Sequence, residues 1–245
     1  MVEARAFEPA FLEHLDRLAL GIKRAQSRRA GRRTLGRIRG PGLELENFRD
    51  YAEGDDLRYL DWSALARLDD LFIRTYRPER EVEVTILIDA SASMDLPRGD
   101  DKFGLARALG AALAYVAMSD NDAVRLAAFS VRGGAVGLQA TPFRRRRESY
   151  SALRPFVSGL CCGGETRLDV AVAELLFERR PKGMVILISD FLVSRLDYEA
   201  ALDRLAAARH EVKAVHVMGG RESRGAYPPG LYRVRDCESG EVREV

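Results

Sequence analysis

Residues Val84-Thr-Ile-Leu-Ile-Asp89-Ala-Ser91-Ala-Ser93-Met94 form a largely apolar run that ends in a small-residue segment carrying one carboxylate and two hydroxyls. Apolar and β-branched residues without polar alternation are typical of a strand covered on both faces, as in a parallel sheet flanked by helices. Where the run ends, Asp89, Ser91 and Ser93 occupy alternate positions and offer only hard oxygen atoms. Such ligands suit Mg²⁺ or a similar ion far better than zinc or copper. The stretch therefore predicts a buried strand that ends in an oxygen-ligand loop.

A second apolar run, at residues 183–190, also ends on a carboxylate, Asp190, and helical and strand patterns alternate around both runs. The expected helices cover residues 9–29, 101–119, 145–158, 168–179 and 198–209; the expected strands cover residues 72–76, 84–89, 122–129, 133–139, 183–190 and 211–217, with a hairpin at 231–245. This alternation predicts an α/β fold with a Rossmann-like, doubly wound and mostly parallel sheet. Ligands of such sheets bind beyond the carboxyl ends of the strands, where the strand order reverses. Asp89 and Asp190 are both expected at that edge.

The chain divides into an N-terminal helical and extended extension, residues 1–80, and a main domain, residues 81–245. The extension begins with an amphipathic helix and continues through a glycine-broken basic loop that includes Arg28 to Arg39. It ends in a dense polar and aromatic block around Trp62. The charged residues of this block are either a partner-binding surface or an ion-pair network that holds the extension on the main domain. The apolar neighbours of Trp62 favour the structural role, because charges near a packed ring need partners.

The composition is that of an ordinary globular protein. Lys and Arg number 39 against 37 Asp and Glu, so the net charge of +2 gives no global argument for nucleic acid or an anionic membrane. The three cysteines, Cys161, Cys162 and Cys237, are an odd number without a secretory signal, which favours a reducing, cytoplasmic setting. No uncharged apolar run approaches the roughly 20 residues that span a bilayer, so no membrane span is expected.

Five oxygen-bearing side chains from three separate loops are expected to meet at the carboxyl edge of the sheet. They are Asp89, Ser91, Ser93, Thr166 and Asp190. A six-coordinate Mg²⁺ would use some of them directly and others through water, and would leave at least one position open to an incoming carboxylate. The ordinary alternative is that these residue types cap helices and close turns. Their joint occurrence at strand ends favours the metal site.

This constellation resembles the metal-ion-dependent adhesion site (MIDAS) of von Willebrand factor A-type domains, in which Asp-x-Ser-x-Ser is followed by a loop Thr and a loop Asp. The five residues match that pattern one by one. The resemblance implies a von Willebrand factor A-like domain that binds Mg²⁺, or Mn²⁺ or Ca²⁺, and a protein partner that supplies an acidic residue to the ion. The related loops usually read Gly-Gly-Thr, whereas Glu165 intervenes here and would either shift Thr166 or add a carboxylate to the site.

The upstream block carries a second resemblance, over Arg49-Asp-Tyr-x-x-Gly-Asp-Asp-x-Arg58-x-x-Asp-Trp62 and over the closing Asp236-x-Glu238-x-Gly240-Glu. Both are similar to the bacterial domain-of-unknown-function family fifty-eight (DUF58). Members are often encoded beside a MoxR-type AAA+ ATPase, so the resemblance implies a role with that ATPase or its client in the assembly or maturation of protein complexes. Many relatives carry N-terminal membrane helices, and this chain resembles the short, soluble form.

We therefore expect a Mg²⁺-dependent protein-interaction module rather than an enzyme. The alternative from another class is a metal-dependent hydrolase or phosphotransferase that uses the same oxygen cluster. Against it, the sequence has no Asp-x-Asp nucleophile pair, no Gly-rich Lys-Ser/Thr phosphate loop and no histidine base near the site. A further alternative is nucleic-acid binding through the basic segment from Arg28 to Arg39, although that segment lacks interleaved aromatic residues.

Overall fold

The computed structural model describes residues 6–17, 43–68, 70–78, 82–132, 135–178, 180–224, 230–238 and 240–244. They belong to two compact units, which we call the main unit (Met1–Leu20 with Val82–Val245) and the small unit (Gly21–Glu81). Each unit is described by itself below. The basic segment from Arg28 to Arg39, considered above for nucleic-acid binding, lies outside the described residues.

A five-stranded sheet forms the centre of the main unit, with the strand order β5-β4-β3-β6-β7. Its strands are β3 (Glu83–Asp89), β4 (Ala123–Arg132), β5 (Ala135–Ala140), β6 (Met184–Ser189) and β7 (Glu211–His216). β3 is parallel to β4 and β6, β6 is parallel to β7, and β5 runs antiparallel to β4. The chain adds strands first on one side of β3 and then on the other, so the strand order reverses between β3 and β6. The predicted α/β fold with a mostly parallel sheet is confirmed.

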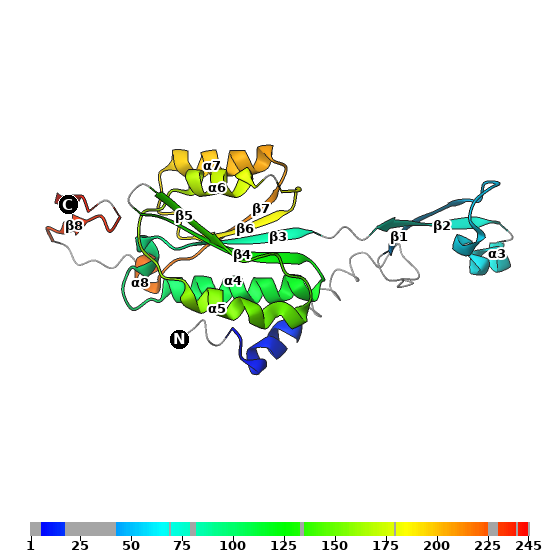
Figure 1. Cartoon of the computed structure of the whole chain (residues 1–245), viewed down its shortest axis with the longest axis horizontal. Coiled ribbons are helices and arrows are strands. Elements are labelled where there is room, and N and C mark those ends of the chain that lie inside the picture. The colour runs from blue at the N-terminus through cyan, green and yellow to red at the C-terminus, as the bar shows by residue number, and fades with distance from the viewer. Residues whose placement is uncertain are drawn as a thin grey trace. The chain divides into compact units, whose positions relative to one another are not determined.

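Helices cover both faces of this sheet (Figure 1). They are α4 (Lys102–Ser119) and α5 (Arg154–Gly159) on one face, and α6 (Leu168–Phe177) and α7 (Arg195–Ala207) on the other. The short elements of this unit are η2 (Ala92–Asp95), η3 (Arg147–Leu153) and α8 (Gly220–Arg224), with a C-terminal hairpin of β8 (Arg233–Arg235) and β9 (Val242–Glu244). Each crossover between parallel strands thus carries a helix, as parallel pairing requires.

The core of the main unit lies in two layers, one on each side of the sheet. Successive residues of a strand face opposite sides, so Ile86 and Ile88 join the buried cluster beneath α4 whereas Leu87 joins the cluster beneath α6 and α7. A glycine lets α4 lie close to β3, because a Cβ at Gly110 would come within 2.8 Å of Ile88 Cδ1. β3 and β6 are therefore covered on both faces, which explains their nearly uninterrupted apolar sequences.

The residues before position 18 also pack on the main unit. Residues 9–17 are helical, and the hydroxyl of Tyr150 donates to the carbonyl oxygen of Ala6 at 2.9 Å. Asp16 accepts a hydrogen bond from the Tyr115 hydroxyl at 3.0 Å and forms an ion pair with Arg147 at 2.5 Å. The structure thus groups this helix with the main sheet, whereas the sequence prediction places it in the extension.

The small unit contains an antiparallel pair of strands with two short helices between them. Its elements are β1 (Leu43–Asp50), η1 (Leu57–Tyr59), α3 (Trp62–Leu68) and β2 (Phe72–Pro78). Its charged residues pair locally at the surface: Arg49 makes two hydrogen bonds to Asp55, and Asp56 caps η1 by accepting from the Arg58 backbone. These pairs are local and lie at the surface of the small unit, so they do not test the predicted ion-pair network that holds the extension on the main domain.

Trp62 differs from its predicted packing. Its side chain is 62% exposed, whereas Leu60 and Ile73 supply the buried apolar contacts of the small unit. The apolar residues near Trp62 in the sequence therefore do not predict its packing: Leu60, which follows η1, is buried, whereas Trp62, the first residue of α3, is exposed.

Several elements differ from the sequence expectations, and the short helices α3 and η2 were also not predicted. β1 was not predicted, and its register is interrupted between Leu45 and Asn47, which disturbs the alternation that marks a strand. α8 has only five residues, too few to show a helical period. Residues 145–158, expected as one helix, form η3 and then α5, because Pro155 lacks the N–H group that a continuous helix needs and is favoured in a first turn.

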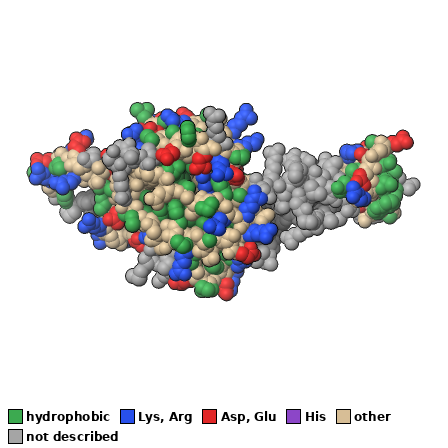
Figure 2. Space-filling view, viewed as in Figure 1, with side chains coloured by type: hydrophobic (Ala, Val, Ile, Leu, Met, Phe, Trp, Pro, Cys, Tyr) green, Lys and Arg blue, Asp and Glu red, His purple; other side chains and the backbone are tan. Residues whose placement is uncertain are grey.

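The surface carries both signs of charge. On the face shown in Figure 2, Lys and Arg side chains are interspersed with Asp and Glu side chains. This distribution agrees with the near balance of charge in the sequence. Among the residues described in that view, no broad area of a single sign argues for a polyanionic partner.

Candidate metal-binding site

Two carboxylates meet where the strand order reverses. β3 ends at Asp89, and its parallel neighbour β6 ends at Ser189, one residue before Asp190. The backbone pairing of Ile88 with Ile188 puts the two strand ends side by side. The hydroxyl of Ser189 donates to Asp89 Oδ2 at 2.6 Å, which joins the two strand ends next to both carboxylates. This is the position at which open α/β sheets hold their ligands.

The two predicted serines lie in the loop that follows β3. Ser91 N donates to Asp89 Oδ1 at 2.9 Å, which fixes the turn after the strand. Ser91 Oγ lies 3.0 Å from Ser93 Oγ, and both residues are buried. The 3-10 helix η2 begins at Ala92 and directs Ser93 inward. The Asp-x-Ser-x-Ser spacing thus gathers three oxygen-bearing side chains at one point.

The loop that carries Thr166 is attached to the same turn. Gly163 N donates to Ala90 O at 2.8 Å, and Ala92 N donates to Gly164 O at 2.9 Å. Both glycines have positive φ, 143° and 88°, and Gly164 occupies a backbone region that other residues adopt only with strain. Thr166 is buried at the end of this loop. All three predicted loops therefore reach one edge of the sheet.

Glu165, the inserted residue, adds no carboxylate to this cluster. Its backbone N and O pair with Val131 at 2.8 and 3.0 Å, in an isolated antiparallel bridge. Because neighbouring residues in extended chain point in opposite directions, Glu165 is exposed while Thr166 is buried. Of the two predicted effects of Glu165, the added carboxylate is wrong.

Asp89 is the most buried carboxylate of the site, with no exposed surface. Ser189 Oγ donates to its Oδ2 at 2.6 Å, opposite the bond from Ser91 N. Burial raises the pKa of Asp89 to about 6, although these hydrogen bonds favour the charged form and act against the shift. A cation next to Asp89 would relieve this cost of desolvation.

A buried lysine, which the sequence analysis missed, provides one cation. Lys102, the first residue of α4, has a side chain that is 1% exposed, and its Nζ lies 3.0 Å from Asp190 Oδ2 and 2.6 Å from Glu222 Oε1. Burial alone would lower the pKa of Lys102, but the bonds to Glu222 and Asp190 outweigh it, so the pKa lies above its usual value. Lys102 therefore holds α4, β6 and α8 together as an ammonium ion.

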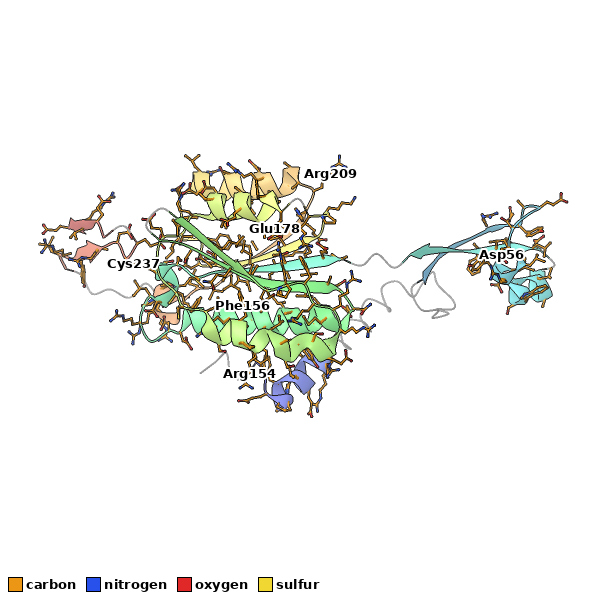
Figure 3. All side chains as sticks on the ribbon, in the orientation of Figure 1. Asp56, Arg154, Phe156, Glu178, Arg209 and Cys237 are labelled. Atoms are coloured by element: carbon orange, nitrogen blue, oxygen red, sulfur yellow. The ribbon has the colours of Figure 1, made fainter. Side chains whose placement is uncertain are left out.

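A further carboxylate comes from the C-terminal hairpin. Glu238 Oε1 accepts from Thr166 Oγ1 at 2.7 Å, and Glu238 Oε2 accepts from Thr166 N at 2.8 Å. Partial desolvation and then the charges of Glu238, Asp236 and Asp190 raise the pKa of the Cys237 thiol, although the residue is exposed. Figure 3 labels Cys237 beside the main sheet. The closing motif of the sequence contained Glu238, but it was not assigned to the site.

The donor set and the charge balance fit a divalent cation. Asp190 and Glu222 bind Lys102, Glu238 binds Thr166, and Asp89 is held by Ser91 and Ser189. Against the one ammonium of Lys102, these four carboxylates leave three negative charges in excess when all are ionised. Over the described ranges, no group of three or more His, Cys, Asp or Glu is arranged to hold a metal ion. The candidate ligands are thus two carboxylates supplemented by the hydroxyls of Ser91, Ser93 and Thr166, which suits Mg²⁺.

These features define an α/β protein with an oxygen-rich, negatively charged site at the carboxyl edge of a mostly parallel sheet. Residues 47–245 match the family described as "Protein of unknown function DUF58". The chain belongs to this family, as the sequence resemblance predicted.

Similar proteins come from mycobacteria and, among solved structures, from Bacteroides. An uncharacterized protein of Mycobacterium tuberculosis (strain ATCC 25618 / H37Rv) and one of Mycobacterium bovis (strain ATCC BAA-935 / AF2122/97) are each 35% identical over 214 residues, which cover 86% of this chain. The chain spans 65% of the length of these curated relatives.

An aerotolerance-related membrane protein from Bacteroides fragilis NCTC 9343 aligns with a TM-score of 0.43 and 18% identity, over 67% of this chain and 81% of that one. BatB from Bacteroides thetaiotaomicron aligns with a TM-score of 0.43 and 19% identity, over 66% and 75% of the two chains. In the part of this chain that the structure describes, no helix has the length and apolar character to cross a membrane.

Proposed function

We propose that this chain is a von Willebrand factor A-like module that binds a protein partner through Mg²⁺ held at a metal-ion-dependent adhesion site. The observation that carries the proposal is the meeting of Asp89, Ser91, Ser93, Thr166 and Asp190, all buried, at the carboxyl edge where the strand order reverses. An excess of negative charge surrounds them. A divalent ion there would be held by hard oxygens and would keep a coordination position for an external ligand.

The partner supplies an acidic side chain to the ion. Carboxylate oxygens are preferred ligands of Mg²⁺, and the site already receives one carboxylate, from Glu238, on Thr166. Following the resemblance of the sequence, we propose that the partner is a MoxR-type AAA+ ATPase or its client, in the assembly or maturation of protein complexes in the cytoplasm. The same oxygen ligands would also bind Mn²⁺ or Ca²⁺, and titration with each ion identifies the one that binds most tightly.

Calorimetric titration of the full chain with Mg²⁺, Mn²⁺ and Ca²⁺ tests the metal site. Ser93→Ala removes one hydroxyl from the cluster, and Ser158→Ala is the matched control, because Ser158 Oγ donates to Arg154 O on the exposed surface of α5. Ser93→Ala is expected to weaken ion binding by at least about tenfold, the effect of losing an interaction worth about 1.4 kcal/mol. Equal binding by wild type and Ser93→Ala, or no binding by wild type, contradicts the proposal.

Retention of the partner provides the second test. The chain is immobilised and exposed to the purified MoxR-type ATPase of the same bacterium, with Mg²⁺ or with EDTA. We expect capture only with Mg²⁺, by wild type and Ser158→Ala but not by Ser93→Ala. Capture that persists in EDTA would remove the metal from the interaction.

A further inference from the structure

The loop of the C-terminal hairpin is built to present one acidic side chain. Asp236 N donates to Glu241 O at 2.8 Å, and Gly240 N donates to Asp236 O at 3.0 Å, which closes the loop between β8 and β9. Asp236 Oδ1 accepts from Glu238 N at 2.8 Å. Gly240 has a φ of 75°, a conformation that glycine adopts without strain. These bonds hold the backbone at Asp236 and at Glu238 N, while the Glu238 carboxylate points away from the hairpin to Thr166.

Both carboxylate oxygens of Glu238 accept hydrogen bonds from the same residue, Thr166. Oε1 meets the hydroxyl and Oε2 meets the backbone N–H of Thr166, at 2.7 and 2.8 Å. Hydrogen bonds to an ionised carboxylate are stronger than neutral ones. Because Thr166 is buried and is one of the candidate metal ligands, the hairpin places a carboxylate directly against the candidate site.

The rest of the hairpin buries little apolar surface against the main unit. All described residues of β8 and β9 are exposed, and Leu231, just before β8, is 97% exposed. Val234 and Val242 are also exposed. Burial of apolar area provides most of the stability of a docked element, so this hairpin can leave the main unit at small cost. The Glu238–Thr166 contact is therefore expected to control whether the hairpin stays docked on the main unit.

We propose that Glu238 is an internal carboxylate ligand of the candidate site, and that the acidic residue of a partner must displace it. This inference rests on the function proposed above and adds its regulation: the docked hairpin is the closed state, and its release opens the site. A tethered ligand has an effective concentration in the millimolar range. If a single carboxylate binds the site with a Kd of about 0.1 mM, the tethered Glu238 weakens an external ligand about tenfold.

Two substitutions at Glu238 and one matched control test this arrangement in the full chain. Glu238→Gln removes the charge and Glu238→Ala removes both acceptor oxygens. Glu241→Gln changes an acidic residue of the same hairpin whose carboxylate pairs with Arg243 instead. Hydrogen exchange read by mass spectrometry should show faster exchange over residues 230–244 in both Glu238 variants than in wild type and Glu241→Gln. Equal exchange in all four proteins would overturn the proposal.

Access to the site is measured with a labelled peptide that copies residues 232–242, with Cys237→Ser, by fluorescence anisotropy in saturating Mg²⁺. We expect binding about tenfold tighter to both Glu238 variants than to wild type and Glu241→Gln, and none by a peptide carrying Glu238→Gln. Equal affinity for all four proteins, or no binding to any of them, overturns the inference. Calorimetry with Mg²⁺ on the same proteins separates the two proposals. If Mg²⁺ binds but the peptide affinities contradict the role of Glu238, only the further inference is refuted. If Mg²⁺ does not bind, the proposed function itself is refuted.

Discussion

Replacing Asp89 by Asn should stabilise the metal-free protein at neutral pH. The pKa of Asp89 is raised from 3.8 to about 6 by burial, so the folded state binds a proton more tightly than the unfolded state does. Stability therefore falls as the pH rises from about 4 to about 6, and the full penalty, about 3 kcal/mol for two pKa units, persists above that range. Asn carries no charge and avoids the penalty. It loses about 1 kcal/mol because its amide cannot accept from both Ser189 and Ser91, which leaves a net gain of about 2 kcal/mol.

Urea unfolding in EDTA, followed by far-ultraviolet circular dichroism at several pH values, measures this difference. Fluorescence is unsuitable, because the single tryptophan, Trp62, belongs to the small unit and not to the unit that carries the site. The advantage of Asp89→Asn should be greatest above pH 6 and should disappear near pH 4. Saturating Mg²⁺ should reverse the order, since only wild type gains binding energy. A variant that is less stable than wild type in EDTA by the same amount at every pH would refute the argument that Asp89 is a desolvated carboxylate.

The other predictions concern the groups around Asp89. Lys102→Met leaves the buried Asp190 and the partly buried Glu222 without their cation. It should lower the free energy of unfolding by about 3 kcal/mol in EDTA and tighten Mg²⁺ binding in calorimetry. Unchanged stability would show that the ion pairs contribute nothing. Ser189→Ala removes the hydroxyl that donates to Asp89 Oδ2. The free energy of unfolding in urea should fall by about 1–3 kcal/mol at pH 7 and by less near pH 4. A loss of the same size at both pH values would point to packing alone. Gly183→Ala, just before β6, would bring a Cβ within 2.2 Å of the Glu83 carbonyl oxygen and should lower the free energy of unfolding by about 1–3 kcal/mol. The control Gly159→Ala should show no such loss, because a Cβ at Gly159 meets no atom within 4 Å.

The sheet and the carboxyl-edge residues were predictable because their signals are local. An apolar run of strand length that ends on Asp89 and another that ends on Asp190 mark two buried parallel strands, and the fold class then brings their carboxyl ends together. Ser189 was available from the same reasoning, since a polar residue at the end of an otherwise buried strand needs a hydrogen-bond partner. The exposure of Glu165 follows from its backbone bridge with Val131, which no sequence pattern announces.

Lys102 and Glu238 could not be predicted because their roles depend on distant partners. Lysine is rarely buried, and the partners of Lys102 lie 88 and 120 residues further along the chain. Glu238 meets Thr166 across 72 residues, from a hairpin with exposed strands. Tertiary structure alone decides that these two charges lie at the site.

The packing of residues 6–17 on the main unit changes how the small unit is joined to the rest of the protein. Because Ala6 and Asp16 are held by Tyr150, Tyr115 and Arg147, the chain leaves the main unit and returns to it, so the small unit is an insertion with two covalent tethers. One cut by a protease, in either tether, would leave it attached through the other. Complete release requires two cuts, and the N-terminal fragment would then remain bound to the main unit by non-covalent contacts.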